Sequence, residues 1–285
     1  HIVPFMGTGA QDSIYVIENG INGAIILRSG YNTNDPLNTS SSWDTVLNMA
    51  PISLYAQVKS TLVHSGRFYI GMSSGELFST IDGTNWVKND SVAYGFNDPN
   101  NYQIMALEAF GGYIYAGTEN YLGAQLWRSA DQLNWSLVKT YATSERITDM
   151  EVTGTELWIA AQSNNSTGGI IERTSDGVVF NTSDEAATTG EYGNHGEEGK
   201  LKVFGNNMYY GTRNYGMGVM AGPGGPATRG GGGSTGGQIW RTCLIAPPTL
   251  NLGNDTTICS SQSITLDAGP GAVSYYWNTE DTVQT

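Results

Sequence analysis

The residues best suited to chemistry lie in one short acidic segment, residues 191–199. Its sequence, Glu-Tyr-Gly-Asn-His-Gly-Glu-Glu-Gly, contains one of the three histidines of the chain and three carboxylates. An imidazole beside carboxylates can bind a divalent cation or hydrogen-bond a sugar. We therefore predict a ligand site formed by Tyr192, His195, Glu197 and Glu198, in which His195 and Glu197 would be the metal ligands. The alternative is a solvated acidic turn, because surface loops accumulate polar residues.

Aromatic residues in predicted connecting segments offer a second kind of binding surface. Tyr121 and Tyr215 lie in such segments, each next to an asparagine. The face of a tyrosine ring can stack on a sugar ring. We include both tyrosines among the candidate ligand-binding residues. The alternative is that their rings only fill the bases of the loops with apolar surface.

The sequence contains no convincing catalytic set, and we expect no enzyme activity and no catalytic residue. A sialidase, the enzyme class that we weigh as the alternative, needs a cluster of arginines for a carboxylate, a Tyr–Glu nucleophile pair and an acid. Half of the eight arginines occupy equivalent positions of a sequence repeat that is described below, namely Arg28, Arg128, Arg173 and Arg241. Equivalent positions would be spread around a ring of repeats, so these arginines could not converge on one carboxylate. The glycines at 230–233 lack the lysine and the strand-to-helix context of a phosphate loop.

A repeat of about 45 residues must position these side chains. Each of five units contains an aromatic strand with a small residue, and most continue with a strand that ends near Arg-Ser or Arg-Thr, as in 115–118 and 126–129. Apolar residues alternate with small or polar ones in these segments, which predicts β-strands. Four short strands per repeat are typical of a propeller blade. The sequence therefore predicts an all-β fold, a β-propeller with five repeat units. These units form either a five-bladed ring or part of a larger ring that has further blades at its N-terminal side.

Three of the units share an aspartate turn that is followed by an aromatic residue. The aspartates are Asp82, Asp131 and Asp176. A carboxylate at this position can accept hydrogen bonds from the N–H groups of the turn while the aromatic ring packs beneath it. These turns resemble Asp-box turns, which are structural in the families that carry them, and we expect the same role here.

The composition changes at Pro247–Pro248, which predicts a domain boundary. Residues 249–285 include Leu-Asn-Leu-Gly-Asn-Asp-Thr-Thr-Ile-Cys and Ser-Ile-Thr-Leu-Asp-Ala-Gly. This segment resembles the start of the Ig-like, PKD-like modules of type IX-secreted surface adhesins of Bacteroidota. A complete module of this kind needs about seven strands and about 80 or more residues. We therefore expect a propeller over 1–246, a truncated Ig-like module over 247–285, and a chain that is part of a longer polypeptide.

The propeller segment has a resemblance of its own. Strands such as Tyr-x-Gly-Thr-x-Asn at 115–120 and turns such as Trp-Arg-Ser-x-Asp at 127–131 resemble those of bacterial kelch-like and Asp-box-like propeller repeat proteins. The resemblance spans most of residues 10–243 and implies no defined reaction. It implies a secreted product on the cell surface.

The resemblance to Bacteroidota surface proteins also implies two covalent features. Cys259 would pair with a cysteine beyond Thr285, the alternative being a bond to Cys243. Such proteins carry O-glycans at Asp-Ser or Asp-Thr followed by an aliphatic residue or threonine. Five triplets of this kind predict glycans on Ser13, Thr45, Ser91, Thr256 and Thr282. The alternative is that Asp-Ser and Asp-Thr are simply favourable turn pairs.

The charge of the chain limits its partners. Its 13 basic and 26 acidic residues give a formal net charge of −13, which disfavours nucleic-acid binding. Ca²⁺ is the only cofactor that we consider, and no segment is apolar enough to insert into a membrane. We expect a non-enzymatic, secreted cell-surface adhesin or binding module that binds a surface glycan or protein through propeller loops. The alternatives are a degenerate sialidase-like glycan hydrolase and a structural subunit of an extracellular filament.

Overall fold

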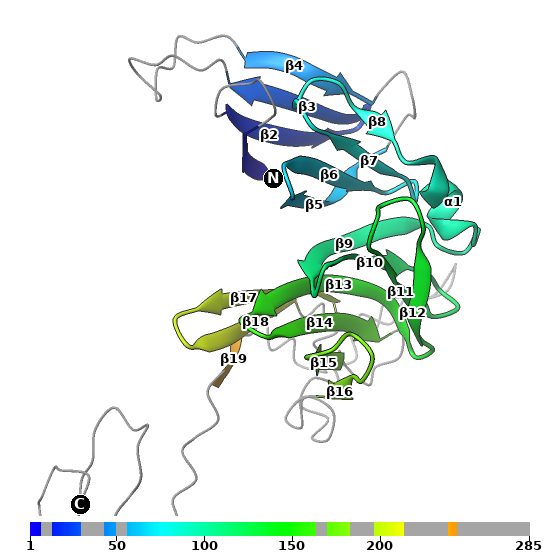
Figure 1. The fold of residues 1–285 in the computed structure, drawn as a ribbon, viewed down its shortest axis with the longest axis vertical. Helices are drawn as coiled ribbons and strands as arrows, with labels where there is room; N and C mark the ends of the chain where they lie inside the picture. The colour runs from blue at the N-terminus through cyan, green and yellow to red at the C-terminus, as the bar shows by residue number, and fades with distance from the viewer. Residues whose placement is uncertain are drawn as a thin grey trace, which may run out of the picture. The chain divides into compact units, whose positions relative to one another are not determined.

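The computed structural model describes residues 1–6, 13–29, 43–49, 56–163, 170–182, 197–213 and 239–243, which are almost entirely β-strands and turns (Figure 1). The prediction of an all-β chain is confirmed. The chain divides into two units, His1–Thr242 and Cys243–Thr285. Apart from Cys243, the second unit lies outside the described residues, and with it the predicted Ig-like module.

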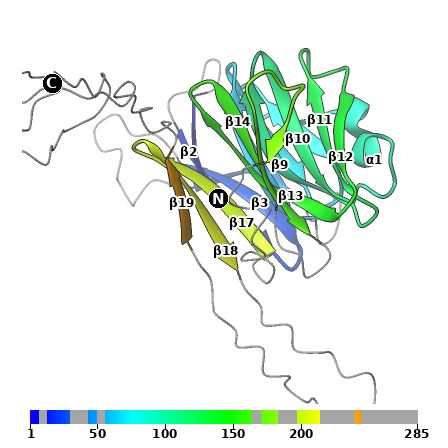
Figure 2. The same ribbon diagram turned by 90° about the horizontal axis from the view of Figure 1, so that it is seen from below.

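The described strands form successive antiparallel groups, here called blades one to five, in which neighbours in sequence are neighbours in the sheet (Figures 1 and 2). Blade one contains β1 (Ile2–Phe5), β2 (Ser13–Gly20), β3 (Gly23–Ser29) and β4 (Trp43–Asn48). Blade two contains β5 (Val58–His64), β6 (Arg67–Met72), β7 (Leu77–Thr80) and β8 (Val87–Lys88). Blade three contains β9 (Gln103–Phe110), β10 (Tyr113–Glu119), β11 (Ala124–Ser129) and β12 (Ser136–Tyr141).

The last two blades follow the same order. Blade four contains β13 (Ser144–Thr153), β14 (Glu156–Ser163), β15 (Ile170–Thr174) and β16 (Asn181–Thr182), and blade five contains β17 (Glu197–Phe204), β18 (Asn207–Arg213) and β19 (Ile239–Cys243). The 3₁₀-helix η1 (Asp90–Val92) and the single-turn α1 (Ala93–Phe96) connect blades two and three. Repeated antiparallel groups, four-stranded in the first four cases and with three described strands in the last, are typical of a propeller-like fold. That the chain forms a propeller of five blades stays a prediction.

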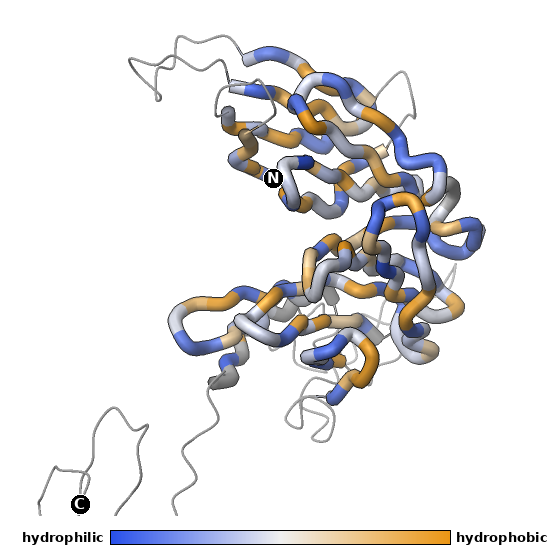
Figure 3. Tube along the Cα trace, viewed as in Figure 1, coloured by the Kyte–Doolittle hydropathy of each residue, from blue (hydrophilic) through white to orange (hydrophobic). Residues whose placement is uncertain are grey.

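The hydrophobic core lies between consecutive blades. Figure 3 shows hydrophobic and hydrophilic residues alternating along the strands, as expected for strands with two different faces. At the first interface the rings of Tyr15 and Phe68 lie 5.6 Å apart. The glycine of the Tyr-x-Gly motif permits a close approach of the next blade: a Cβ on Gly117 would lie 2.6 Å from Cγ2 of Ile147. This spacing explains why the repeat has a small residue there.

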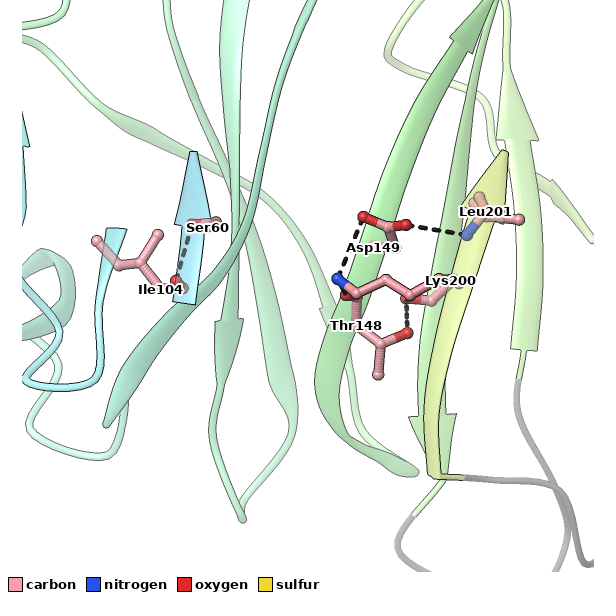
Figure 4. Close-up of polar contacts among 7 residues, drawn as sticks. Ser60, Ile104, Thr148, Asp149, Lys200 and Leu201 are labelled. Carbon is pink, nitrogen blue, oxygen red and sulfur yellow. Dashed lines mark hydrogen bonds and ion pairs between the residues drawn. The ribbon is translucent and has the colours of Figure 1, made fainter. Parts of the chain in front are cut away.

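Side-chain contacts join the first strands of successive blades (Figure 4). The hydroxyl of Ser60 on β5 donates to the carbonyl oxygen of Ile104 on β9 at 3.0 Å. Between β13 and β17, the carboxylate of Asp149 accepts from the backbone N–H of Leu201 at 2.9 Å, and Nζ of Lys200 lies 3.5 Å from it. These bonds satisfy backbone groups that have no strand partner on that side.

The three aspartate turns have the geometry expected from their sequence. Oδ1 of Asp82 accepts from two backbone N–H groups of its own turn at 2.9 and 2.7 Å, and Asp131 and Asp176 do the same in their turns. These N–H donors hold the pKa of each carboxyl below its ordinary value. Each carboxylate therefore forms its hydrogen bonds within its own turn, as expected for a structural role.

Candidate functional site

A row of four polar residues crosses from blade three into blade four. The strand registers pair Gln103 on β9 with Glu119 on β10, Glu119 with Arg146 on β13, and Arg146 with Gln162 on β14. The single Glu119–Arg146 pair also joins the two blades into one sheet. Residues that are 59 positions apart in the chain, Gln103 and Gln162, thus belong to one row.

The centre of the row is an ion pair between a buried carboxylate and a partly exposed guanidinium. Oε1 of Glu119, which is only 3% exposed, lies 3.3 Å from Nη2 of Arg146, and its Oε2 accepts from Nε2 of Gln103 at 2.6 Å. Removing a charge from water is costly unless it is paired and hydrogen-bonded, and both conditions hold for Glu119.

Other polar atoms around this ion pair are buried without a hydrogen-bond partner. Among the described residues they are Oε1 of Gln103, Nε of Arg146, Oγ of Ser144 and Oε1 of Gln162. Buried polar groups are normally satisfied, and exceptions gather where water or a ligand binds. These four atoms are two amide oxygens that accept hydrogen bonds, one guanidinium N–H that donates, and one hydroxyl that can do both.

An exposed tyrosine pair lies beside the row. Tyr102 immediately precedes β9 and Tyr121 follows β10; their rings lie 5.2 Å apart, and they are 47% and 53% exposed. The negative charge of Glu119, with partial burial and a hydrogen bond to that carboxylate, raises the pKa of Tyr121. The Tyr121 hydroxyl therefore contacts the buried carboxylate while much of its ring remains open to solvent.

A hydrogen-bond network holds the loops that carry the two tyrosines. Oδ1 of Asn101 accepts from the Thr118 hydroxyl at 3.0 Å and from Nδ2 of Asn120 at 2.9 Å. Nδ2 of Asn101 donates to Oε1 of Gln125 at 2.7 Å, and the N–H of Tyr102 donates to the carbonyl oxygen of Glu119 at 2.9 Å. The rings are thus held by fixed backbone, which lowers the entropy cost of binding.

Of the candidate residues predicted from sequence, Tyr121 lies at this site. Tyr192, His195 and Tyr215 lie outside the described residues, as do the side chains of Glu197 and Glu198, whose backbone begins β17. Within the part of the chain that the structure describes, no group of three His, Cys, Asp or Glu residues could hold a metal ion. Metal binding at His195 and Glu197 stays a prediction.

The predicted covalent modifications also remain predictions. Ser13 begins β2, Thr45 is an exposed residue of β4, and Ser91 lies in η1 with its hydroxyl 2.5 Å from Oδ1 of Asn89. Thr256, Thr282 and Cys259 lie outside the described residues. In the described ranges no helix has both the length and the apolar character needed to cross a bilayer.

The sequence analysis missed Tyr102, Gln103, Glu119, Arg146 and Gln162. Glu119 and Tyr121 directly follow the repeated Tyr-x-Gly-Thr motif, and that position was the one available signal. Arg146 and Gln162 could not be associated with them because only the strand registers bring them together.

A second carboxyl with an unusual environment is Glu108 on β9. Burial, together with the negative charges of Glu151 and Asp149, raises the pKa of Glu108 to about 7. The unfolded chain releases this proton near pH 4.5, so between these values the folded state binds more protons. Stability therefore decreases as the pH rises from about 4.5 to about 7.

Glu108→Gln is expected to remove this decrease. Because the side chain is only partly buried, we expect the variant to gain about 1–2 kcal/mol over the parent at pH 8 and much less at pH 4.5. Chemical denaturation at the two pH values measures both differences. Glu18→Gln, an exposed change on β2, is the control; an equal gain at both pH values for Glu108→Gln would contradict the assignment.

No family model and no curated protein matches this chain. Among solved structures it is similar to a chain of a nidogen/laminin complex, with 10% identity, a TM-score of 0.45, and coverage of 71% of this chain and 68% of that one. YCF48 bound to a D1 peptide is 14% identical with a TM-score of 0.44, and the match covers 76% of this chain and 64% of that one. A prolyl endopeptidase is 10% identical with a TM-score of 0.42, and the match covers 75% of this chain but only 31% of that one, less than a third of its length.

At these values the similarities carry no argument about activity, ligand or partner. The propeller-like fold rests on the strand order of the chain itself. None of these similarities assigns the chain to a family.

Proposed function

We propose that this chain is a non-enzymatic binding module of a cell-surface adhesin, and that it binds an uncharged glycan at the tyrosine pair Tyr102 and Tyr121. The observation that carries this proposal is the pair of exposed rings beside buried polar atoms that lack partners. Sugar rings have apolar faces that stack on tyrosine, and their hydroxyls both donate and accept hydrogen bonds.

The charges of the site favour an uncharged sugar. The guanidinium of Arg146 is already paired with the carboxylate of Glu119, so it offers little attraction to a carboxylate on a ligand. The net charge of −13 repels acidic glycans further. The unpartnered amide oxygens of Gln103 and Gln162 can only accept hydrogen bonds, and because both are buried, a sugar hydroxyl would reach them through a bridging water.

The contacts of Glu119 support binding rather than hydrolysis. A catalytic carboxylate must reach the anomeric carbon or the glycosidic oxygen. Glu119 is buried and is already engaged by Arg146, Gln103 and Tyr121. Its role in this proposal is to hold Arg146 and Tyr121 in place.

The test is binding of the intact chain to an array of neutral and sialylated oligosaccharides. We expect binding to neutral glycans that falls about five- to 150-fold for Tyr121→Ala and for Tyr102→Ala, since removing a stacking aromatic costs about 1–3 kcal/mol. Trp43→Ala, which removes an equally exposed ring from β4, should bind like the parent. Binding that is unaffected by the tyrosine variants, preference for sialylated glycans, or turnover of aryl glycosides would contradict the proposal.

A further inference from the structure

The first strands of blades two, three and four share one irregularity in their pairing. In each, the register against the second strand shifts by one residue beside the same repeat position, which is Gly71, Gly117 and Ala160 in turn. The first strand therefore has one residue without a counterpart: Lys59 on β5, Met105 on β9 and Thr148 on β13. An extra residue of this kind is a β-bulge, which bends a strand and increases its twist. Because it recurs, this bulge belongs to the geometry of the repeat.

Blade four has a second bulge, at the start of its first strand. Ser144 on β13 pairs with Ser163 on β14 and Arg146 pairs with Gln162, so Glu145 has no counterpart. The described registers of blades two and three each shift only once. The repeat therefore does not require this second bulge. Bulges re-aim individual side chains and are over-represented beside functional sites, so Glu145 is a candidate for a role of its own.

The second bulge lies directly against the loop that carries Tyr121. The carbonyl oxygen of Glu145 accepts from the backbone N–H of Asn120 at 2.6 Å, and Asn120 immediately precedes Tyr121. The next residue of the strand, Arg146, pairs in register with Glu119. Glu119 is the main cause of the raised pKa of Tyr121, and the negative charge of Glu145 contributes to it as well. Glu145 is thus close enough to Tyr121 to act on its hydroxyl.

Two carboxylates act on the Tyr121 hydroxyl, and only that of Glu145 is available to a ligand. Glu119 is 3% exposed and is engaged by Arg146. Glu145 is partly exposed, and within the described part of the chain its carboxylate forms no hydrogen bond and no ion pair. Its two oxygens can therefore accept hydrogen bonds from a molecule that lies on the tyrosine pair.

We propose that Glu145 determines the specificity of the glycan site: its carboxylate accepts hydrogen bonds from two adjacent hydroxyls of a sugar whose ring stacks on Tyr102 and Tyr121. This inference rests on the proposed glycan function and adds the class of ligand, a neutral hexose with two free neighbouring hydroxyls. A carboxylate has two acceptor oxygens and no donor, which matches two hydroxyl donors. Hydrogen bonds to an ionised acceptor are about twice as strong as neutral ones.

The contact with Glu145 supplies what stacking and the buried amides do not. Stacking on the exposed rings orients a sugar only weakly, because the apolar faces of many different sugars fit an aromatic ring. The buried amide oxygens of Gln103 and Gln162 are reached only through water. A few exposed polar groups next to an apolar surface fix the orientation of a ligand and so give specificity. The negative charge of Glu145 also disfavours a sugar that carries a carboxylate.

The test compares the parent chain with Glu145→Gln in solution binding to neutral oligosaccharides that end in glucose, galactose or mannose. Each probe is used in its native form and with each pair of adjacent terminal hydroxyls methylated in turn. We expect Glu145→Gln to bind the preferred native probe about tenfold more weakly than the parent, because a neutral amide oxygen replaces an ionised acceptor. Once the hydroxyls that Glu145 contacts are methylated, parent and variant should bind with equal, weak affinity, because neither can form the contact.

Glu145→Lys provides a second readout, which a purely structural role of Glu145 would not change. A positive charge at this position should strengthen binding of sialylated oligosaccharides relative to the parent, while binding of the neutral probes falls. The control is Glu18→Gln, which removes an exposed carboxylate from β2 and should bind every probe like the parent. Thermal unfolding checks that the variants are folded, and both replacements of Glu145 retain its backbone bond to Asn120.

The outcomes separate the role of Glu145 from the proposed function. A loss confined to the native probe, with a gain for sialylated glycans in Glu145→Lys, is the expected result. If Tyr102→Ala and Tyr121→Ala weaken binding but Glu145→Gln binds like the parent, or binds native and methylated probes equally less, the role of Glu145 is refuted and the glycan site stands. If the parent binds no neutral probe, or the tyrosine variants bind like the parent, the proposed function fails and the role of Glu145 fails with it.

Discussion

Gly177→Ala is expected to lower the free energy of unfolding by about 2–4 kcal/mol. Gly177 lies in the aspartate turn of blade four with φ of +70°, which an L-residue adopts only with strain. A methyl group there would also collide with the hydroxyl of Tyr115 from blade three, and Arg128 donates to the Gly177 carbonyl oxygen at 3.1 Å. The substitution would therefore disrupt the contact between two blades as well as the turn.

The matched control is Gly154→Ala. Gly154 also has a positive φ, +53°, but a Cβ there would meet no atom within 4 Å, so only the backbone strain of about 1–2 kcal/mol applies. Chemical denaturation of both variants measures the difference. Equal losses would show that the approach of Tyr115 to the turn contributes nothing to stability.

Arg146→Leu is expected to lower the free energy of unfolding by about 2–3 kcal/mol, because it leaves the buried carboxylate of Glu119 without its ion-pair partner. Glu119 is 3% exposed, and its pairing with Arg146 joins β10 to β13. Adding Glu119→Gln should restore much of the loss, since the neutral amide can keep its hydrogen-bond partners without burying a charge. Equilibrium denaturation of the single and double variants measures this recovery.

Arg173→Leu provides the comparison for an exposed ion pair. Arg173 lies 3.4 Å from Glu156, and both side chains are substantially exposed, so its removal should cost less than about 1 kcal/mol. If Arg146→Leu were no more destabilising than Arg173→Leu, the ion pair at the proposed glycan site would not be a structural element of the two blades.

Local patterns were sufficient to predict most of the strands and turns in the described residues. The alternation of apolar residues predicts β10 and β11, and the aspartate turns at Asp82, Asp131 and Asp176 have the hydrogen bonds that their sequence implies. These features depend on residues within a few positions of one another, so their physics is complete in a short segment. The small residue of the Tyr-x-Gly motif was visible too, although its partner on the next blade was not.

The candidate site and the burial of equivalent repeat positions depend on tertiary structure. Arg146 reaches Glu119 only because β13 pairs with β10, and Gln162 joins them through the next register. Nor could the sequence distinguish Tyr209 from Tyr69 or Tyr115, because all three occupy the same place in the repeat. Periodicity specifies which face of a strand a side chain occupies; what covers that face is determined by long-range packing between blades, which local sequence does not encode.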